Sequence, residues 1–142
     1  MKRTHFPQLL FAALAALALT AGCDTAPKYS PRMTKTCILS PDHPSPDLEV
    51  TVVTAVRIVL PGPAPGSGLV WEIISNNNRV LDQMGPFKTL PASDELGSRP
   101  ASTISFYAKR EGKSELRFFL LRPGQEEAVP VAKCDLVVRV TD

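Results

Sequence analysis

Apolar and polar residues alternate at a period of two from about residue 48 to the C-terminus of this chain. The apolar positions that share a parity are Val50, Val52, Val56, Ile58 and Leu60, then Ile104 and Phe106, then Cys134, Leu136, Val138 and Val140. This period is typical of strands that bury one face. Thirteen of the 14 prolines follow residue 22, and because proline breaks helix interiors, they argue against a helix bundle.

The expected strands are short and are separated by irregular segments at 61–68, 91–101 and 122–130. About six to eight such strands, with Trp71 on an early central one, are typical of an immunoglobulin-like β-sandwich of about seven strands. A barrel is the alternative. Residues 50–60 form either one long strand or two that bend near Thr54. Phe119 and Leu121 give another strand a second apolar face, which is either covered or presented outward.

The first 23 residues have the parts of a bacterial export signal. Two basic residues precede an eleven-residue apolar run, Leu9 to Leu19, which is too short to span a bilayer permanently. The run Leu19-Thr-Ala-Gly-Cys23 resembles a lipobox, in which the cysteine is lipidated and becomes the first mature residue. We expect residues 1–22 to be a lipoprotein signal peptide and Cys23 to carry the membrane anchor. A plain secretory signal is the alternative.

A lipid anchor implies a place in the cell envelope, facing the periplasm or the cell surface. Asp24 resembles the residue that retains some lipoproteins at the inner membrane, but that rule differs between bacteria and leaves the membrane open. Residues 24–36 have no apolar periodicity. We therefore predict a lipidated tether over residues 23–36 and a folded domain over residues 37–142.

Charge and histidine content restrict the function. The 120 residues after the signal carry 14 basic and 14 acidic side chains, whereas nucleic acids and anionic membrane surfaces attract a basic excess. Of the two histidines, only His43 follows the signal, and we expect it to be a solvated loop residue between prolines. No nucleophile–base pair or cluster of metal ligands can be assembled. These observations predict a binding protein rather than an enzyme, with no nucleic-acid partner, metal or cofactor.

Two further cysteines, Cys37 and Cys134, lie near the ends of the expected domain. In an oxidising compartment such a pair is more often a disulfide than two thiols, so we predict a Cys37–Cys134 bridge. A catalytic thiol is the alternative, although the chain has no Cys-x-x-Cys motif.

A run rich in proline and glycine precedes the tryptophan: Ala64-Pro65-Gly66-Ser67-Gly68, then Leu69, Val70 and Trp71. It resembles the first loop of the chagasin family of cysteine protease inhibitors, which carries Asn-Pro-Thr-Thr-Gly, an aromatic residue, a variable residue and tryptophan. Pro65, Gly68 and Trp71 match and Ser67 is a conservative change. The positions that depart are Ala64, Gly66 and Leu69.

The resemblance extends over residues 48–140. Leu96-Gly97-Ser98-Arg99-Pro100-Ala101 stands where the family has its glycine-rich second loop but holds a single glycine, and Gly112-Lys-Ser-Glu-Leu116 resembles the family's step into the next strand. The family's third loop begins Arg-Pro-Trp or Arg-Pro-Phe. Here it begins Arg122-Pro123-Gly124, without the aromatic residue.

The resemblance implies an immunoglobulin-like fold whose three loops at one end block the cleft of a papain-type cysteine protease. The protease-binding residues would be Ala64, Pro65, Gly66, Ser67 and Gly68 in the first loop, Gly97, Ser98 and Arg99 in the second, and Arg122, Pro123 and Gly124 in the third. The protein would be a monomer anchored through Cys23. The alternative is a non-inhibitory envelope lipoprotein whose sandwich binds another periplasmic or surface protein.

Overall fold

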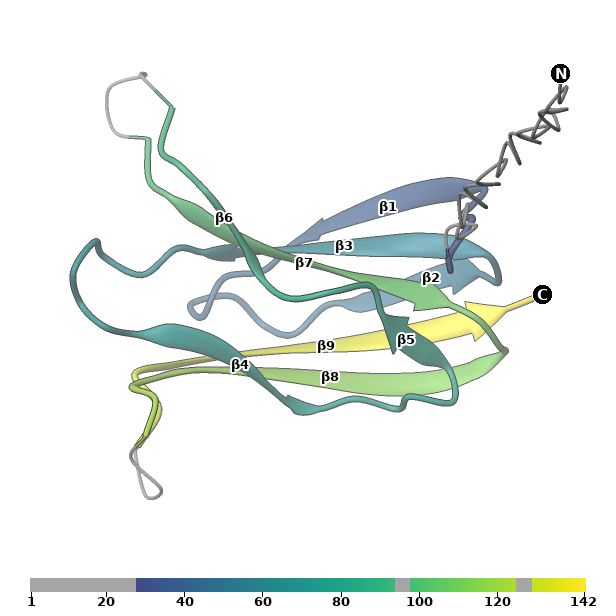
Figure 1. The fold of residues 1–142 in the computed structure, drawn as a ribbon. Coiled ribbons are helices and arrows are strands. Elements are labelled where there is room, and N and C mark those ends of the chain that lie inside the picture. The colour runs from purple at the N-terminus through teal and green to yellow at the C-terminus, as the bar shows by residue number, and fades with distance from the viewer. Residues whose placement is uncertain (1–27, 94–97, 125–128) are drawn as a thin grey trace, which may run out of the picture.

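The computed structural model describes residues 28–93, 98–124 and 129–142, which form an all-β sandwich (Figure 1). The strands are β1 (Met33–Ile38), β2 (Asp47–Thr51), β3 (Thr54–Pro61), β4 (Val70–Ser75), β5 (Leu81–Gln83), β6 (Lys88–Leu90), β7 (Ala101–Ala108), β8 (Gly112–Leu121) and β9 (Ala132–Thr141). The predicted immunoglobulin-like sandwich is confirmed, with nine strands in the described residues rather than about seven. Over the same residues no helix is long and apolar enough to cross a membrane.

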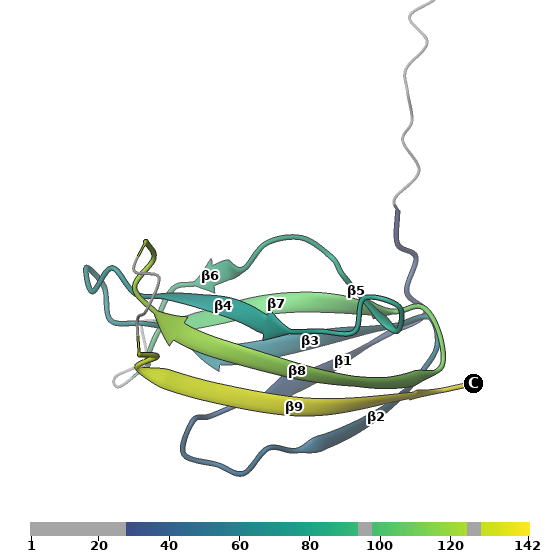
Figure 2. The ribbon, with the colours of Figure 1, turned by 90° about the horizontal axis from the view of Figure 1, so that it is seen from below.

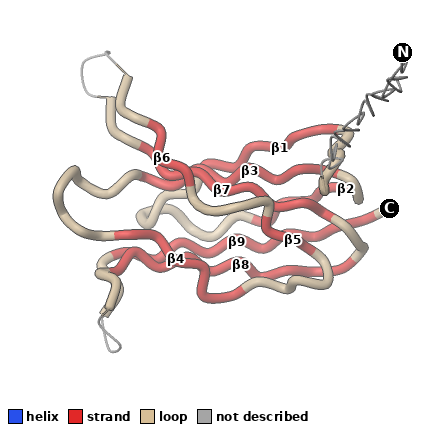
Figure 3. The backbone as a smooth tube through the Cα atoms, in the orientation of Figure 1, coloured by secondary structure: helices blue, strands red, loops and turns tan. Residues whose placement is uncertain are grey.

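The strands form two layers, which overlap in the view of Figure 2 and are drawn as a continuous tube in Figure 3. One sheet has the order β1-β3-β7-β5, with β6 also paired to β7, and the other has the order β2-β9-β8-β4. The pairs β1–β3 and β2–β9 are parallel, and the remaining pairs are antiparallel. The strands β3, β7, β8 and β9 are each paired on both sides, so the connections that join them to their neighbours start from well-paired strand ends.

The core lies between the sheets and is made by the alternating positions that the sequence indicates. Ile58 in β3, Phe106 in β7 and Phe118 in β8 are all fully buried, and the rings of Phe106 and Phe118 lie 6.5 Å apart at a tilt. Trp71 is 5% exposed and lies in the core, but its predicted place on a central strand is wrong, because β4 lies at the edge of its sheet. Burial of these large apolar side chains is the main free energy that holds the two sheets together.

The stretch 50–60 is two strands that belong to different sheets. β2 ends at Thr51 and pairs with β9, whereas β3 begins at Thr54 and pairs with β7. Val53 turns the chain between them with a φ of 66°, an uncommon conformation for a β-branched residue. The alternation continues across this turn because both strands face the same core.

The ordered domain begins before Cys37, within the stretch predicted to be the tether. β1 starts at Met33 and runs parallel to β3, and further upstream the Arg32 amide donates to the Val53 carbonyl at 2.9 Å. β1 is an edge strand whose side chains are mostly exposed, so it carries no alternation for sequence reasoning to detect.

The second apolar face of β8 is half-buried. Phe119 stands on the outer side of its sheet, in register with Glu72 of β4 and Lys133 of β9, and the Lys133 ammonium lies 5.2 Å from its ring centroid. β8 is therefore a central strand whose outer apolar residue is partly covered by its neighbours.

Candidate functional site

The described parts of three connections lie at the same end of the sandwich: residues 62–69 between β3 and β4, 91–93 and 98–100 between β6 and β7, and 122–124 and 129–131 between β8 and β9 (Figure 1). The C-terminus lies at the opposite end. The structure thus brings together the described parts of the three segments that the sequence singles out. Gly97 in the second segment, and Cys23 in the export signal, lie outside the described residues.

The first loop is built on a tight turn. The Ser67 amide donates to the Ala64 carbonyl at 3.1 Å, with Pro65 at the second turn position and Gly66 at the third with a φ of 76°. Proline followed by a residue of positive φ defines a type II turn. Gly68 also has a positive φ, 69°, and the Leu69 amide donates to Ser67 Oγ at 3.3 Å. The turn holds exposed backbone at the tip of the loop.

Trp71 joins the two ends of this loop. Its indole Nε1 donates a 2.8 Å hydrogen bond to the carbonyl of Pro61, the last residue of β3. Pro61 belongs to one sheet and Trp71 to the other, so the bond also ties the two layers at the loop end. The burial of the ring fixes the donor, which makes the base of the loop rigid.

The described part of the second loop packs beside the first. The Ser93 amide donates to Ser98 Oγ at 2.8 Å, which closes the loop across its neck. Arg99 is exposed, and Pro100 then leads into β7. The Gly62 amide donates to the Pro100 carbonyl at 2.8 Å, so the first two loops share a hydrogen bond at their base.

The third loop contacts the first through Arg122. Its guanidinium Nη2 lies 3.4 Å from the Ser67 carbonyl, at long hydrogen-bond distance. Pro123 and Gly124 are exposed, and Gly124 has a φ of 81°. Arg99 and Arg122 place two exposed cations at this end of the domain.

Two exposed valines were missed by the sequence reasoning. Val129 is 86% exposed and Val131 is 67% exposed, and both precede β9, where the third loop returns to the sheet. Val131 is held by its amide, which donates to the Leu120 carbonyl at 2.8 Å. Apolar side chains so exposed beside a loop tip are candidates for contact with a partner. The available signal was the sequence around these valines, Val129-Pro-Val131, in which no polar residue alternates with them as it would in a strand.

The predicted Cys37–Cys134 disulfide is absent, because both residues are free thiols. Cys37 lies on β1 and Cys134 on β9, in opposed sheets, and both pack against the core. Burial raises the pKa of Cys37, and it raises the pKa of the Cys134 thiol to about 11. A thiol of raised pKa is a poor nucleophile at neutral pH, which argues against the catalytic alternative.

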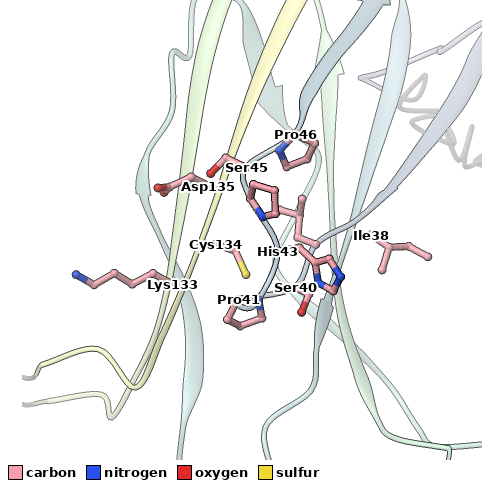
Figure 4. Close-up of a pocket in the computed structure, with 11 residues that line it drawn as sticks. Ile38, Ser40, Pro41, His43, Ser45, Pro46, Lys133, Cys134 and Asp135 are labelled. Atoms are coloured by element: carbon pink, nitrogen blue, oxygen red, sulfur yellow. The ribbon is translucent and has the colours of Figure 1, made fainter.

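A cavity of about 510 Å³ lies between the β1–β2 connection and the start of β9 (Figure 4). Pro41, His43 and Ser45 stand on the connection, and Cys134 and Asp135 line the strand side. His43 is exposed in this loop, as predicted. Across the described ranges, no group of three or more potential ligand side chains is placed to hold a metal ion.

No protein-family model matches the chain, and no curated protein matches it in sequence. Solved structures do resemble it. The cysteine protease inhibitor EhICP2 of Entamoeba histolytica superposes with a TM-score of 0.59 at 16% identity, over 79% of this chain and 100% of the inhibitor. Amebosin superposes with a TM-score of 0.53 at 18% identity, again over 79% and 100% of the two chains. The likeness confirms the fold that the sequence resemblance implies.

Proposed function

We propose that this protein inhibits papain-type cysteine proteases by inserting its three end loops into the active-site cleft. The observation that carries the proposal is the contact between the loops: Arg122 reaches the Ser67 carbonyl, and Gly62 bonds the Pro100 carbonyl. Three loops from three different connections therefore form one continuous edge. The shared fold with an Entamoeba histolytica cysteine protease inhibitor supports the same function.

The first loop is suited to a narrow cleft. Its type II turn, from Ala64 to Ser67, is held by Pro65 and by the hydrogen bond from the Ser67 amide to the Ala64 carbonyl, so little conformational freedom is lost on binding. Gly66 and Gly68 carry no side chain, and space is open beside both, which allows the backbone to approach a catalytic thiol. Binding occludes the cleft without cleaving a bond.

The third loop lacks the aromatic residue of the family pattern, and interface energy usually concentrates in such anchors. Val129 and Val131 supply exposed apolar area later in the same connection. We propose that they replace the missing anchor, and that Arg99 and Arg122 contact acidic groups around the cleft of the protease.

We also propose that the protein is a lipoprotein of the bacterial cell envelope, anchored through Cys23. The lipobox-like run before that residue supports this assignment. Growth of an expressing bacterium with a labelled fatty acid should label the wild-type protein, and a Cys23→Ser variant should lose the label while Cys37 and Cys134 remain. A label retained by the variant would contradict anchoring at this position.

The inhibition is tested by titrating active papain with the mature protein, purified in detergent. We expect competitive inhibition with a constant below about 1 µM. Gly68→Val should weaken it, whereas Gly85→Val is the matched control, because both glycines have positive φ and open space beside them. Absence of inhibition at about 100 µM against several papain-type proteases would contradict the proposal and favour a non-inhibitory envelope module.

A further inference from the structure

The base of the first loop contains hydrogen bonds that the sequence resemblance does not describe. We refer to four residues at this place, Pro61, Gly62, Trp71 and Pro100, as the loop junction. Pro61 is the last residue of β3 and stands in register with Ala101, the first residue of β7. Gly62 and Pro100 are the next pair, at the point where the two strands separate into their loops.

The hydrogen bonds of the loop junction are restricted by its prolines. Pro61, Pro63 and Pro100 have no amide hydrogen, so Gly62 supplies the donor on this part of the first loop. It donates to the Pro100 carbonyl at 2.8 Å, while the Pro61 carbonyl accepts from the Trp71 indole at 2.8 Å. The first bond joins the first loop to the second, and the other closes the first loop on itself.

Gly62 is required here by close approach. A Cβ atom at this position would lie 2.6 Å from the Pro100 carbonyl oxygen and 2.7 Å from its carbonyl carbon. Both atoms belong to the backbone, so no side-chain rotation can relieve the clash. Any larger residue must push the segment before β7 away from the first loop.

Displacement at the loop junction moves the loops relative to each other. Arg122 contacts the Ser67 carbonyl, so the position of the third loop also depends on where the first loop stands. The β4–β8 pairing of Trp71 with Leu120 joins the first and third connections from the other sheet.

We propose that Gly62 and Trp71 are positioning residues, which set the spacing of the three loops without themselves contacting the protease. This inference rests on the proposed function, since it describes how the same edge is assembled. A rigid, preset edge binds with less loss of conformational freedom than three independent loops. It predicts that inhibition depends on residues behind the loop tips.

The test uses Gly62→Ala and Trp71→Phe in the mature protein, the latter removing the indole donor while keeping an aromatic ring. Each should raise the inhibition constant for papain by about tenfold or more. The stoichiometry of the titration should stay at one, because folded molecules still bind but fit less well. A merely structural defect would instead lower the fraction of active inhibitor and leave the constant unchanged.

Gly85→Ala is the matched control. Its φ of 118° makes the substitution strained, but it lies in the β5–β6 connection with open space around it. It should lower the thermal unfolding midpoint and leave the inhibition constant unchanged. Wild-type inhibition constants in both Gly62→Ala and Trp71→Phe would overturn the proposal. Should Gly62→Ala fail to fold, Trp71→Phe alone decides between the two results.

Amide NMR spectra separate this inference from the proposed function. Gly62→Ala should shift the amide resonances of Ser67, Ser98 and Arg99 in the free protein. Shifts confined to residues 61–64 would overturn the positioning role, whatever the protease result. If the wild-type protein inhibits no protease, the proposed function fails, and the spectra still decide whether the junction positions the loops.

Discussion

The phenolic hydroxyl of Tyr29 donates a 2.8 Å hydrogen bond to Asp82 Oδ2, and its ring lies 5.3 Å from that of Tyr107. Lys28 and Lys109 lie within 3.5 and 3.9 Å of the same carboxylate. The chain before β1 is thereby fastened to β5 and β7, although its sequence has no apolar pattern. These contacts lie near the β7–β8 turn, far from the three loops.

Tyr29→Phe removes the hydroxyl and keeps the ring. The hydrogen bond from Tyr29 holds the pKa of Asp82 below its ordinary value, with Lys109 and Lys28 adding to the effect. We expect the free energy of unfolding to fall by about 1 kcal/mol or less at pH 7, because solvent screens a partly exposed pair. Urea unfolding at pH 7 measures it.

The same pair has a defined pH dependence. A carboxyl whose pKa is lowered by folding stabilises the protein above its unfolded pKa of about 4, and this contribution disappears as the pH falls through the folded pKa. The difference between wild type and Tyr29→Phe should therefore shrink below about pH 4. In an Asp82→Asn background the effect of Tyr29→Phe should no longer vary with pH over this range.

Val131→Asp should weaken protease inhibition by about tenfold or more, because it places a charge where exposed apolar area is proposed to contact the partner. Met33→Asp is the matched control, since Met33 is 59% exposed on β1 and lies away from the loop end. Inhibition constants for papain are compared at equal salt. Equal effects of the two substitutions would remove Val131 from the interface.

Cys37 and Cys134 should react slowly with alkylating reagents in the folded protein. Burial raises the pKa of Cys134 from 9.0 to about 11, so its thiolate is scarce at pH 8 and makes up half of the thiol only at about pH 11. Alkylation rates across this range, followed by intact mass, test the prediction. A Cys23→Ser protein that is not alkylated when it is unfolded without reductant would contain the Cys37–Cys134 disulfide, which would contradict the prediction of two free thiols.

The raised pKa of Cys134 also predicts alkaline instability. The folded state retains the proton to a higher pH than the unfolded state, so the stability that this group contributes is complete below about pH 9 and declines between about pH 9 and 11. Urea unfolding of wild type and Cys134→Ala at pH 8 and pH 10.5 measures the decline. The variant should lose less stability over this interval.

Ser114→Ala should lower the free energy of unfolding by about 1–2 kcal/mol. The buried Ser114 hydroxyl accepts from the Asn77 amide and donates to Asn76 Oδ1, each at 3.0 Å, and holds the β4–β5 turn against β8. The exposed Ser75→Ala is the control and should change stability by about 0.5 kcal/mol or less. Neither variant should alter inhibition, because both positions lie away from the loop junction.

The β-sandwich and its core were predictable because alternation records which side chains face inward. Val56, Ile58 and Phe106 are buried as their parity indicates. β1 was not predictable by that route, because an edge strand with exposed side chains leaves no periodic trace. Its pairing with β3 is set by backbone hydrogen bonds, which the side-chain pattern does not encode.

The candidate site was predictable only in part. Loop positions follow from proline and glycine content, so Ala64 to Gly68 stand at the sandwich end as expected. The role of Gly62 depends on a carbonyl 38 residues away in the chain, at Pro100, and no local pattern reports such an approach. The predicted Cys37–Cys134 disulfide is not seen, and the two residues are free thiols on facing sheets.

The attachment of Tyr29 to Asp82 also limits how the domain can stand on a membrane. If Cys23 carries lipid, the six residues to Tyr29 reach at most about 20 Å, so the bilayer must adjoin the end of the sandwich opposite the loops. Ten-residue strands then hold the loop edge roughly 30 Å further out. With the loops held away from the bilayer, such a protein would meet proteases that diffuse in the surrounding fluid rather than proteases embedded in the membrane beside it.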